Sequence, residues 1–526
     1  MHRFIVRVLA VACAALPIAL PASGQSTGAI EGVVLQREND DPLPGANVYL
    51  EGRNAGAAAA ADGSFAIREV AAGEHVVVAS VLGYETARQS VVVRAGETAR
   101  VVFRLAERPV EIGELVVERV TMTGGYSGVA DVPGAAHYIG PRELETFSYN
   151  NVHRVLAGVP GVYLQEEDGY GLRPNIGLRG TGVERSSKIT VMEDGVLAAP
   201  APYAAPAAYY FPTVGRMQGV EVRKGSSQIK YGPYTTGGAL NLISTQIPSA
   251  FTGRIDVLAG SEAERTLHAV VGDSYENVAF LAEAYQARSN GFKTLTGFVN
   301  ANAGFDYDTG FDKQDYLAKL RVNTDPDAAV YQALTLKLGQ AEETSNETYL
   351  GLTDVDFAAR PYTRYAASQE DVMNTEHRQV QLQHVIRPAS FVDVTTTAYR
   401  HTFKRNWYKL DGVRATAGGD KVSIGSILSD PETYADELAI VKGQPSPNDD
   451  ALDVKNNNRE YYAQGIQTTV GLQIETPALT HDVEGSHAMI GAESARRDGE
   501  CDDVVHAIES HHIEVEVRAL EGVLTQ

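Results

Sequence analysis

A short basic stretch, LRGTGVERSSKITVMEDG at residues 178–195, carries side chains suited to binding an anion. It reads as strand, glycine turn, charged loop, strand and acidic turn, which places Arg185 and Lys188 on the loop. Arginine pairs with carboxylates in a bidentate manner and lysine pairs with them as a point charge, so both residues suit an anionic ligand. Both are equally consistent with solvated loop charges.

Sequence patterns for catalysis, or for a bound metal or cofactor, are missing from the chain. It contains no nucleophile elbow, no paired zinc histidines and no paired carboxylates at an evident site, and GSSQIKYGPYTTGG lacks the Gly-Lys-Ser/Thr of a phosphate-binding loop. His506, Glu509, His511 and His512 lack the spacing of a metal site and indicate a chance grouping. The sequence therefore predicts a protein that is not an enzyme and holds no metal or cofactor.

The overall composition argues against a nucleic-acid partner and for β structure. The 526 residues carry a formal net charge of -22, whereas nucleic-acid binding needs clustered lysine and arginine. The chain has 50 glycines, which favour many turns. It has 25 tyrosines and 14 phenylalanines, which favours strands whose aromatic side chains are partly exposed to water. We expect a mainly β protein without nucleic acid.

The first residues have the pattern of a secretory signal peptide. Arg3 and Arg7 precede a short apolar run, and small residues follow, so we expect residues 1–24 to be a signal peptide. No later apolar run approaches the length of a membrane helix. An exported chain of this kind is either soluble or crosses a membrane as a closed β-barrel, because lipid tolerates no unpaired backbone groups.

Residues 26–106 alternate apolar and polar positions in short segments separated by turns, which predicts a small antiparallel β-sandwich. The segments PLPGANVYL, DGSFAI and GYE resemble the carboxypeptidase regulatory-like domain, a transthyretin-like module. No metal-ligand set is present in them, so the resemblance implies a structural or interaction role.

A linker is expected at residues 107–136, with a short acidic and apolar stretch inside it. An extended peptide of this kind can add as a strand to the edge of a partner's sheet. The pattern alone favours a plain interdomain strand over a strand that binds a partner. The residues of the stretch are Glu111, Ile112, Gly113, Glu114, Leu115, Val116 and Val117.

Residues 137–250 mix helix and strand signals. SYNNVHRVLAGVPGV predicts a short amphipathic helix with Ser148 or Asn150 as its N-cap. The ordered motifs VLAGVPGV, NIGLRG, ITVMEDGV and MQGVEVRKGSSQIKYGPYTTGGALNLIS resemble the α+β plug domain of TonB-dependent outer-membrane receptors. Within that family, APAPYAAPAAYYFP and KYGPYTTGGALN are most similar to the ferric-citrate branch.

The resemblance implies roles for several residues. Arg179 and Arg223 match plug arginines that pair with barrel glutamates and lock the plug in place, and the loop with Arg185 and Lys188 faces the ligand. The stretch at residues 111–117 is the best place for the segment that meets TonB, the energy-transducing partner. Three tyrosines either form the floor of the ligand pocket or pack the plug against the barrel: Tyr203, Tyr209 and Tyr210.

Residues 251–494 contain segments of about ten residues that alternate apolar and polar positions, such as QDYLAKLRVN and GIQTTVGLQI. After a signal peptide and a plug-like block, this pattern favours an antiparallel transmembrane β-barrel. Trp407 and Tyr408 are expected in the aromatic girdle at a membrane interface. The segments supply roughly ten strands, against about 22 in barrels that hold a plug. We therefore expect an incomplete barrel, followed by an aberrant tail at 495–526 from a truncated or frameshifted gene.

Together these features predict an outer-membrane receptor for active uptake of a ferric chelate, either ferric citrate or another siderophore. TonB and outer-membrane lipid are the expected partners. Two alternatives stay open. One is a receptor of the same architecture that imports glycans or peptides, and the other is a secreted, β-rich binding or adhesion module.

Overall fold

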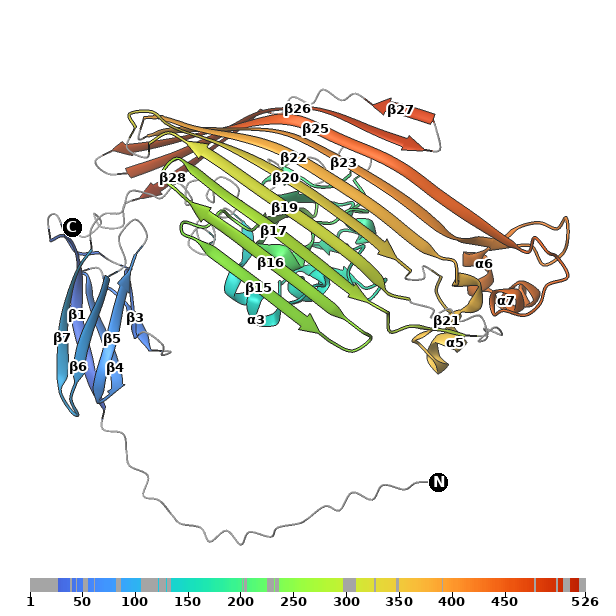
Figure 1. Ribbon diagram of the computed structural model, residues 1–526, viewed down its shortest axis with the longest axis horizontal. Coiled ribbons are helices and arrows are strands. Elements are labelled where there is room, and N and C mark those ends of the chain that lie inside the picture. The colour runs from blue at the N-terminus through green and yellow to red at the C-terminus, as the bar shows by residue number, and fades with distance from the viewer. Residues whose placement is uncertain are drawn as a thin grey trace, which may run out of the picture. The chain divides into compact units, whose positions relative to one another are not determined.

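The computed structural model has two compact units, residues 1–111 and 112–526 (Figure 1). It describes residues 27–105, 122, 129, 134–224, 231, 236–296, 309–476, 479–497, 500–504 and 511–519, with internal gaps at 38–39, 44, 51–54, 61, 82–86, 201, 203–205, 326–327, 347–349 and 390. From residue 472 on, only the course of the backbone is described. Among these residues, no helix is both long and apolar enough to cross a bilayer.

The first unit is a β-sandwich of a three-stranded and a four-stranded sheet, with strand orders β4-β1-β7 and β3-β2-β5-β6. Its core is apolar and includes Ile30, Val34, Phe65 and Phe103, and buried and exposed residues alternate clearly along β7. The predicted sandwich is confirmed, although β1 and β7 pair in parallel. The strands are β1 (Thr27–Gln36), β2 (Asn47–Leu50), β3 (Gly56–Ala58), β4 (Ser64–Ala71), β5 (Gly73–Ser80), β6 (Ala87–Val93) and β7 (Thr98–Leu105).

The next block, residues 135–244, is an α+β unit that we call the plug. A five-stranded sheet in the order β12-β11-β14-β13-β8 forms its centre, beside the two-stranded pair β10-β9. Leu156, Ile176, Leu178, Val220 and Leu240 lie in its buried core. Its elements are β8 (Ala135–Ile139), α3 (Pro141–Phe147), α4 (Val152–Leu156), β9 (Val162–Gln165), β10 (Asn175–Leu178), η2 (Glu184–Ser186), β11 (Ile189–Glu193), β12 (Val196–Leu197), η3 (Val214–Arg216), β13 (Met217–Lys224) and β14 (Gly238–Ser244).

The predicted helix of the plug is present, but its capping residue differs from the prediction. The N-cap of α4 is Asn151, whose side chain accepts a hydrogen bond from His153 N at 2.8 Å. Ser148 instead ends α3 in a left-handed conformation. Asn150 does not cap α4, because its side-chain amide forms hydrogen bonds with Thr266 and Tyr285 instead.

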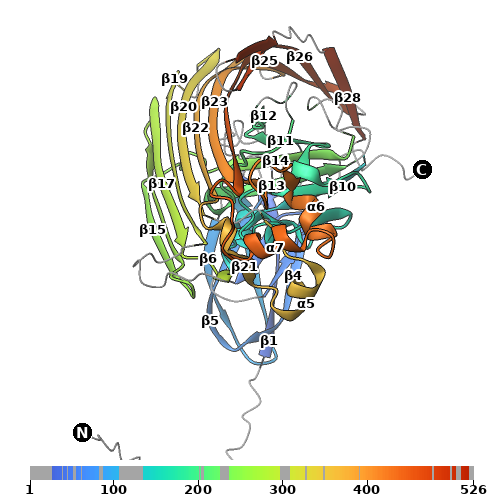
Figure 2. The same cartoon turned by 90° about the vertical axis from the view of Figure 1, so that its right-hand side faces the viewer.

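The remainder of the second unit forms a long antiparallel sheet of 12 strands that curves around the plug sheet (Figure 2). We call this sheet the strand wall. The incomplete barrel expected from the sequence is confirmed. The strands are β15 (Thr252–Ala259), β16 (Arg265–Ser274), β17 (Val278–Ser289), β19 (Phe311–Asn323), β20 (Tyr331–Ser345), β22 (Val372–Ala389), β23 (Val392–Val413), β24 (Val422–Ser423), β25 (Leu452–Thr476), β26 (Leu479–Arg497), β27 (Glu500–Val504) and β28 (His511–Ala519).

The two ends of the strand wall differ in the length of their connections. Short turns join β16 to β17 and β22 to β23, whereas long segments join β20 to β22 and β23 to β25 at the opposite end. The long segments pack together around a core that contains Tyr365, Val413, Ile427 and Val441. They carry β21 (Thr363–Tyr365) and the helices α5 (Asp354–Ala359), α6 (Ile424–Ser429) and α7 (Ala435–Val441). β21 pairs with β18 (Thr294–Thr296), which lies in the segment between β17 and β19. Outer-membrane barrels place short turns in the periplasm and long loops outside.

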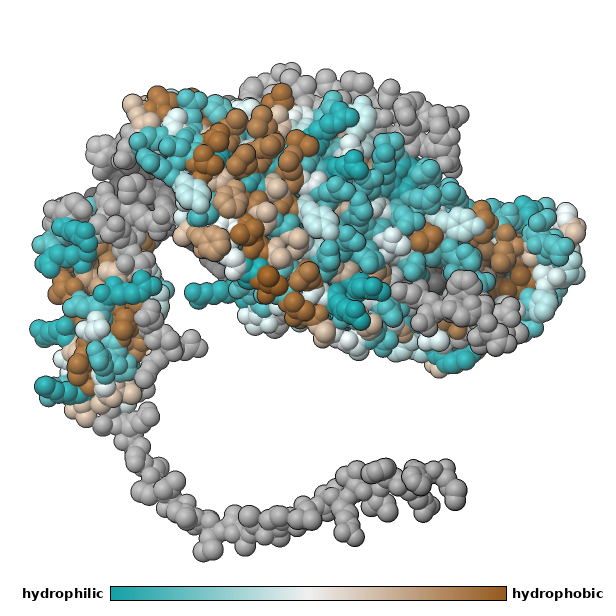
Figure 3. Space-filling view, in the orientation of Figure 1, coloured by the Kyte–Doolittle hydropathy of each residue, from teal (hydrophilic) through white to brown (hydrophobic). Residues whose placement is uncertain are grey.

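The polarity of the strand wall is the reverse of that of a soluble protein. Leu320, Leu338 and Val380 point outward and are 47%, 44% and 48% exposed. Their strand neighbours Lys319 and Lys337 point inward and are buried. The apolar side chains gather in a band across the strands in Figure 3. An apolar outer face around a polar interior is typical of a membrane barrel.

Trp407 does not lie in an outer girdle. It occupies an inward position of β23, where its side chain is 7% exposed and its ring lies 6.3 Å from the ring of Tyr209 in the plug. The expected girdle role of Trp407 is therefore wrong. Strand alternation overrides the general preference of tryptophan for an interface.

Candidate functional site

Buried charges tie the plug to the strand wall. Arg216 of η3 is fully buried, and its Nη2 donates to Glu193 Oε1 at 3.0 Å while its Nε lies 2.9 Å from Asp315 Oδ2 of β19. Lys337 of β20 places Nζ 2.8 Å from Glu193 Oε1 and 2.7 Å from Asp194 Oδ2. One plug arginine and one wall lysine thus share three carboxylates. Arg216 of the plug pairs with Asp315 of the wall, and Lys337 of the wall pairs with Glu193 and Asp194 of the plug.

Both plug carboxyl groups stay ionised in this network. Burial alone would raise the pKa of Glu193, but the positive charges of Arg216 and Lys337 outweigh it and lower the pKa to about 2. Burial also opposes ionisation of Asp194, and the charges of Lys319 and Lys337 hold its pKa below the ordinary value. Glu193 and Asp194 are therefore both ionised at neutral pH.

Acid should loosen the plug only at strongly acidic pH. The pKa of Glu193 falls from 4.5 to about 2 on folding, so its stabilising contribution is complete above the higher value and is lost as the pH drops through the lower one. We expect proteolytic protection of the plug in the full chain to be equal at about pH 7 and about pH 5, and to fall between about pH 4 and pH 2. A loss of protection near pH 6 would contradict the network.

Two further contacts cross the same boundary. Arg173 places Nη2 2.9 Å from Glu343 Oε1 of β20, with both side chains buried. Asn150 accepts a hydrogen bond from Tyr285 OH of β17 at 2.6 Å. The buried ion pair of Arg173 and Glu343 is costly to separate, because each charge would be left without its counterpart. The plug is held along several strands of the wall.

A cationic aromatic cluster lies where the plug meets β23. The guanidinium of Arg405 lies 3.5 Å from the ring centroid of Tyr209, and Lys409 Nζ lies 3.9 Å from the ring of Trp407. Arg185 of η2 approaches the same rings, at 5.6 Å from Tyr209 and 5.9 Å from Trp407. Arg405 and Trp407 come together because residues two apart on a strand share a face.

The arginines of the cluster differ in how their charge is balanced. Arg185 forms a bidentate pair with Glu167 of the plug, and this pair lowers the pKa of Glu167 although burial opposes it. Arg405 is 3% exposed, and in the described part of the chain neither its Nε nor its Nη1 has a hydrogen-bond partner. A buried cation without an acid is unfavourable, so this position suits an anionic ligand.

The structure brings together only some of the residues that the sequence proposes for ligand binding. Arg185 and Tyr209 meet in the cluster, although Arg185 is already paired with Glu167. Tyr210 stacks on His377 of β22 at 3.6 Å, which matches the wall-packing alternative. Lys188 is exposed, and among the described residues no contact joins it to the cluster. Tyr203 lies outside the described residues.

The residues proposed as a lock have other surroundings. Arg179 is exposed in a left-handed turn, with a φ of 53°. Arg223 is buried and donates to Met122 O at 3.0 Å and to Tyr231 OH at 2.5 Å. Their pairing with barrel glutamates remains a prediction. The TonB-box-like stretch at 111–117 lies outside the described residues.

Sequence reasoning missed Arg216, Lys337 and Arg405. A signal for the two wall residues is present in the chain, because each occupies the inward position of a strand whose neighbouring residues point outward. No local pattern marks Arg216, which lies in a single turn before β13.

Comparison with known proteins identifies two domains. Residues 30–117 match the CarboxypepD_reg-like domain, and residues 128–239 match the TonB-dependent Receptor Plug Domain. A short stretch of 49 residues, 9% of this chain, is 71% identical to Ribonuclease Y of Thermobifida fusca (strain YX). It covers 10% of that ribonuclease, so it does not show a ribonuclease activity for this chain.

Two solved structures have a similar fold. The unliganded ferric citrate transporter FecA is 17% identical with a TM-score of 0.50, over 74% of this chain and 52% of that chain. The ferric-catecholate import receptor Fiu from E. coli K12 in its open form is 14% identical with a TM-score of 0.50, over 73% of this chain and 54% of that chain. This chain thus spans about half the length of either receptor.

The geometry and the comparisons agree on the architecture. A small β-sandwich precedes an α+β block that is surrounded by a curved sheet and tied to it by buried charges. The chain therefore combines a CarboxypepD_reg-like domain with the plug domain of TonB-dependent receptors, on the fold of the ferric chelate receptors to which it is similar.

Proposed function

We propose that this protein is an outer-membrane receptor that binds an anionic ferric chelate at the cationic aromatic cluster and imports it with energy supplied by TonB. The observation that carries the proposal is Arg405, a buried cation beside Tyr209 and Trp407 that pairs with no acid among the described residues. A polycarboxylate complex of iron, such as ferric citrate, would supply the missing negative charge. The protein is a binding and transport protein in this account, not an enzyme.

Other features support the membrane setting. The outward apolar band of the strand wall suits lipid, and the long segments at one end suit the outer face of the membrane. The stretch at residues 111–117 would meet TonB as an added strand. Deleting it should abolish energised uptake and leave chelate binding unchanged.

The chain offers an internal probe for this proposal, because Trp407 is its single tryptophan and belongs to the cluster. Titrating the purified full chain with ferric citrate should quench tryptophan fluorescence in a saturable manner. Gallium citrate has the same charge as the iron complex and should compete, reversing the quenching. A neutral oligosaccharide should have no effect.

The result distinguishes the classes of ligand. Saturable quenching by the ferric complex that gallium citrate reverses supports an anionic chelate receptor. Absence of saturable quenching by any ferric chelate, or competition by the neutral oligosaccharide, would refute the proposal.

A further inference from the structure

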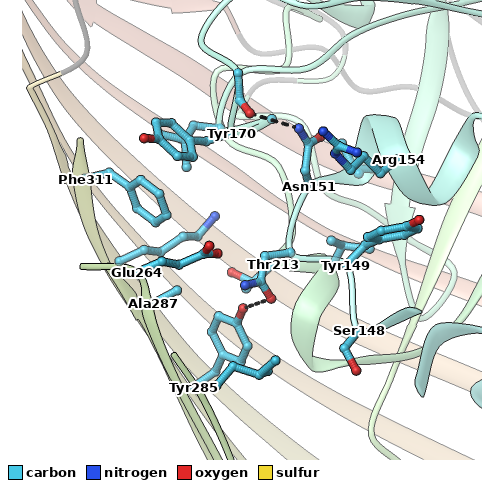
Figure 4. Close-up of a pocket in the computed structure, with 18 of the residues that line it drawn as sticks. Ser148, Tyr149, Asn151, Arg154, Tyr170, Thr213, Glu264, Tyr285, Ala287 and Phe311 are labelled. Atoms are coloured by element: carbon cyan, nitrogen blue, oxygen red, sulfur yellow. Dashed lines mark hydrogen bonds between the residues drawn. The ribbon is translucent and has the colours of Figure 1, made fainter. Parts of the chain in front are cut away.

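Two cavities adjoin between the plug and strands β15, β16 and β17. The first, of about 410 Å³, reaches Gly260 and Phe311, which lie at the long-loop end of the strand wall. The second, of about 640 Å³, extends from there to Arg254, near the short turn between β16 and β17. Figure 4 shows Tyr285 and Phe311 of the wall beside Thr213 and Tyr170 of the plug, and all four line the first cavity.

Asn150 lies where the two cavities meet. It lines both of them, as does Tyr285. Its Oδ1 accepts from Tyr285 OH at 2.6 Å, and its Nδ2 donates to Thr266 Oγ1 at 3.0 Å. One amide thus joins the plug to two neighbouring strands. The ring of Tyr285 is held against the plug turn, where a Cβ on Gly215 would come within 2.4 Å of its hydroxyl.

The contacts at this junction differ from those on the rest of the wall. Arg216 and Lys337 fix the plug to β19 and β20 through buried ion pairs, and opening those would leave uncompensated charges. Asn150, Tyr285 and Thr266 are neutral, and water can replace their hydrogen bonds at a small net cost. The described contacts of the plug along β15–β17 also include the exposed Arg254–Glu145 pair and a hydrogen bond from Thr245, just after β14, to the buried Glu283, but no buried ion pair. Opening on this side should therefore cost less than opening along β19 and β20.

We propose that cargo passes the plug on this side, through the two cavities in turn, and that Asn150 is the gate residue at their junction. The proposal rests on the proposed function and adds a route to it. Both volumes fall within the range of about 300–1,000 Å³ that is typical of small-molecule pockets. Each cavity is thus large enough to hold a small chelate during transit.

The gate can be tested with a cysteine in the second cavity. Glu145, an exposed residue that lines this cavity, is replaced by cysteine in the full chain with Cys13→Ser and Cys501→Ser. This removes the exposed Arg254–Glu145 pair equally from the reference protein and from the variant compared with it. The protein is placed in vesicles with its long loops outward, and a membrane-impermeant maleimide is added outside. Asn150→Ala removes both hydrogen bonds, so labelling of the cysteine should become about tenfold faster. Thr266→Val should give a smaller increase and Thr266→Ser none.

A matched control and the binding assay separate the possible failures. Ser261→Cys lies exposed in the turn at the long-loop end and should be labelled equally with and without Asn150→Ala. Equal labelling of the Glu145 cysteine in both forms, or labelling as fast as that of Ser261→Cys in the closed form, would refute the gate. Trp407 quenching, measured on the same variants, tests the proposed function independently, because Asn150 lies outside the cationic aromatic cluster.

Discussion

Replacing Arg216 with methionine is expected to release the plug from the strand wall. The substitution removes the one cation between Glu193 and Asp315 and leaves both carboxylates in a buried position. Breaking a buried ion pair by removing one partner costs about 3–5 kcal/mol. We expect the urea midpoint of the full chain to fall and the plug to become sensitive to protease at neutral pH.

An exposed ion pair provides the control. Arg254 Nη1 lies 2.7 Å from Glu145 Oε1, and the two side chains are 43% and 61% exposed. Surface pairs contribute about 0–1 kcal/mol, so Arg254→Met should leave stability nearly unchanged. Equal effects of Arg216→Met and Arg254→Met would show that the buried network does not hold the plug.

Replacing Arg405 with methionine is expected to weaken binding of ferric citrate. A hydrogen bond to a charged group contributes about 2 kcal/mol, which corresponds to roughly a 30-fold increase in Kd. Arg405→Lys keeps the charge but loses the planar fork, so it should fall between the wild type and the methionine variant. The affinities follow from titrations of Trp407 fluorescence.

Arg400 is a matched control on the same strand. It is exposed on the outer side of β23, where its guanidinium lies 5.4 Å from the ring of Tyr462. Arg400→Met removes the same charge from the chain without touching the cluster, so chelate affinity should be unchanged. If both variants lose affinity equally, the effect would be one of overall charge and the proposed site would be wrong.

Much of the architecture was predictable because it depends on local pattern. Alternation along QDYLAKLRVN placed Leu320 outside and Lys319 inside, as the structure confirms. The same alternation places Trp407 inside together with Phe403 and Arg405, but its residue type suggested a membrane interface. For a residue within a strand, position decided its environment and residue type did not.

The contacts of the site were less predictable because they are long-range. Lys337 and Glu193 lie 144 residues apart in the chain, and no local pattern indicates that they meet. Arg185 was expected to face a ligand, but Glu167, 18 residues before it, already neutralises its charge. Among the described residues, Arg405 on the wall therefore has no acidic partner, whereas Arg185 on the plug loop has one.

Anomalous diffraction at the iron edge, from crystals of the full chain grown with ferric citrate, would locate the bound chelate. We expect one strong iron peak beside Arg405, Tyr209 and Trp407, with carboxylate oxygens of the ligand within hydrogen-bonding distance of the Arg405 guanidinium. An iron peak elsewhere on the chain, or a saturated crystal with no iron in the cluster, would contradict it.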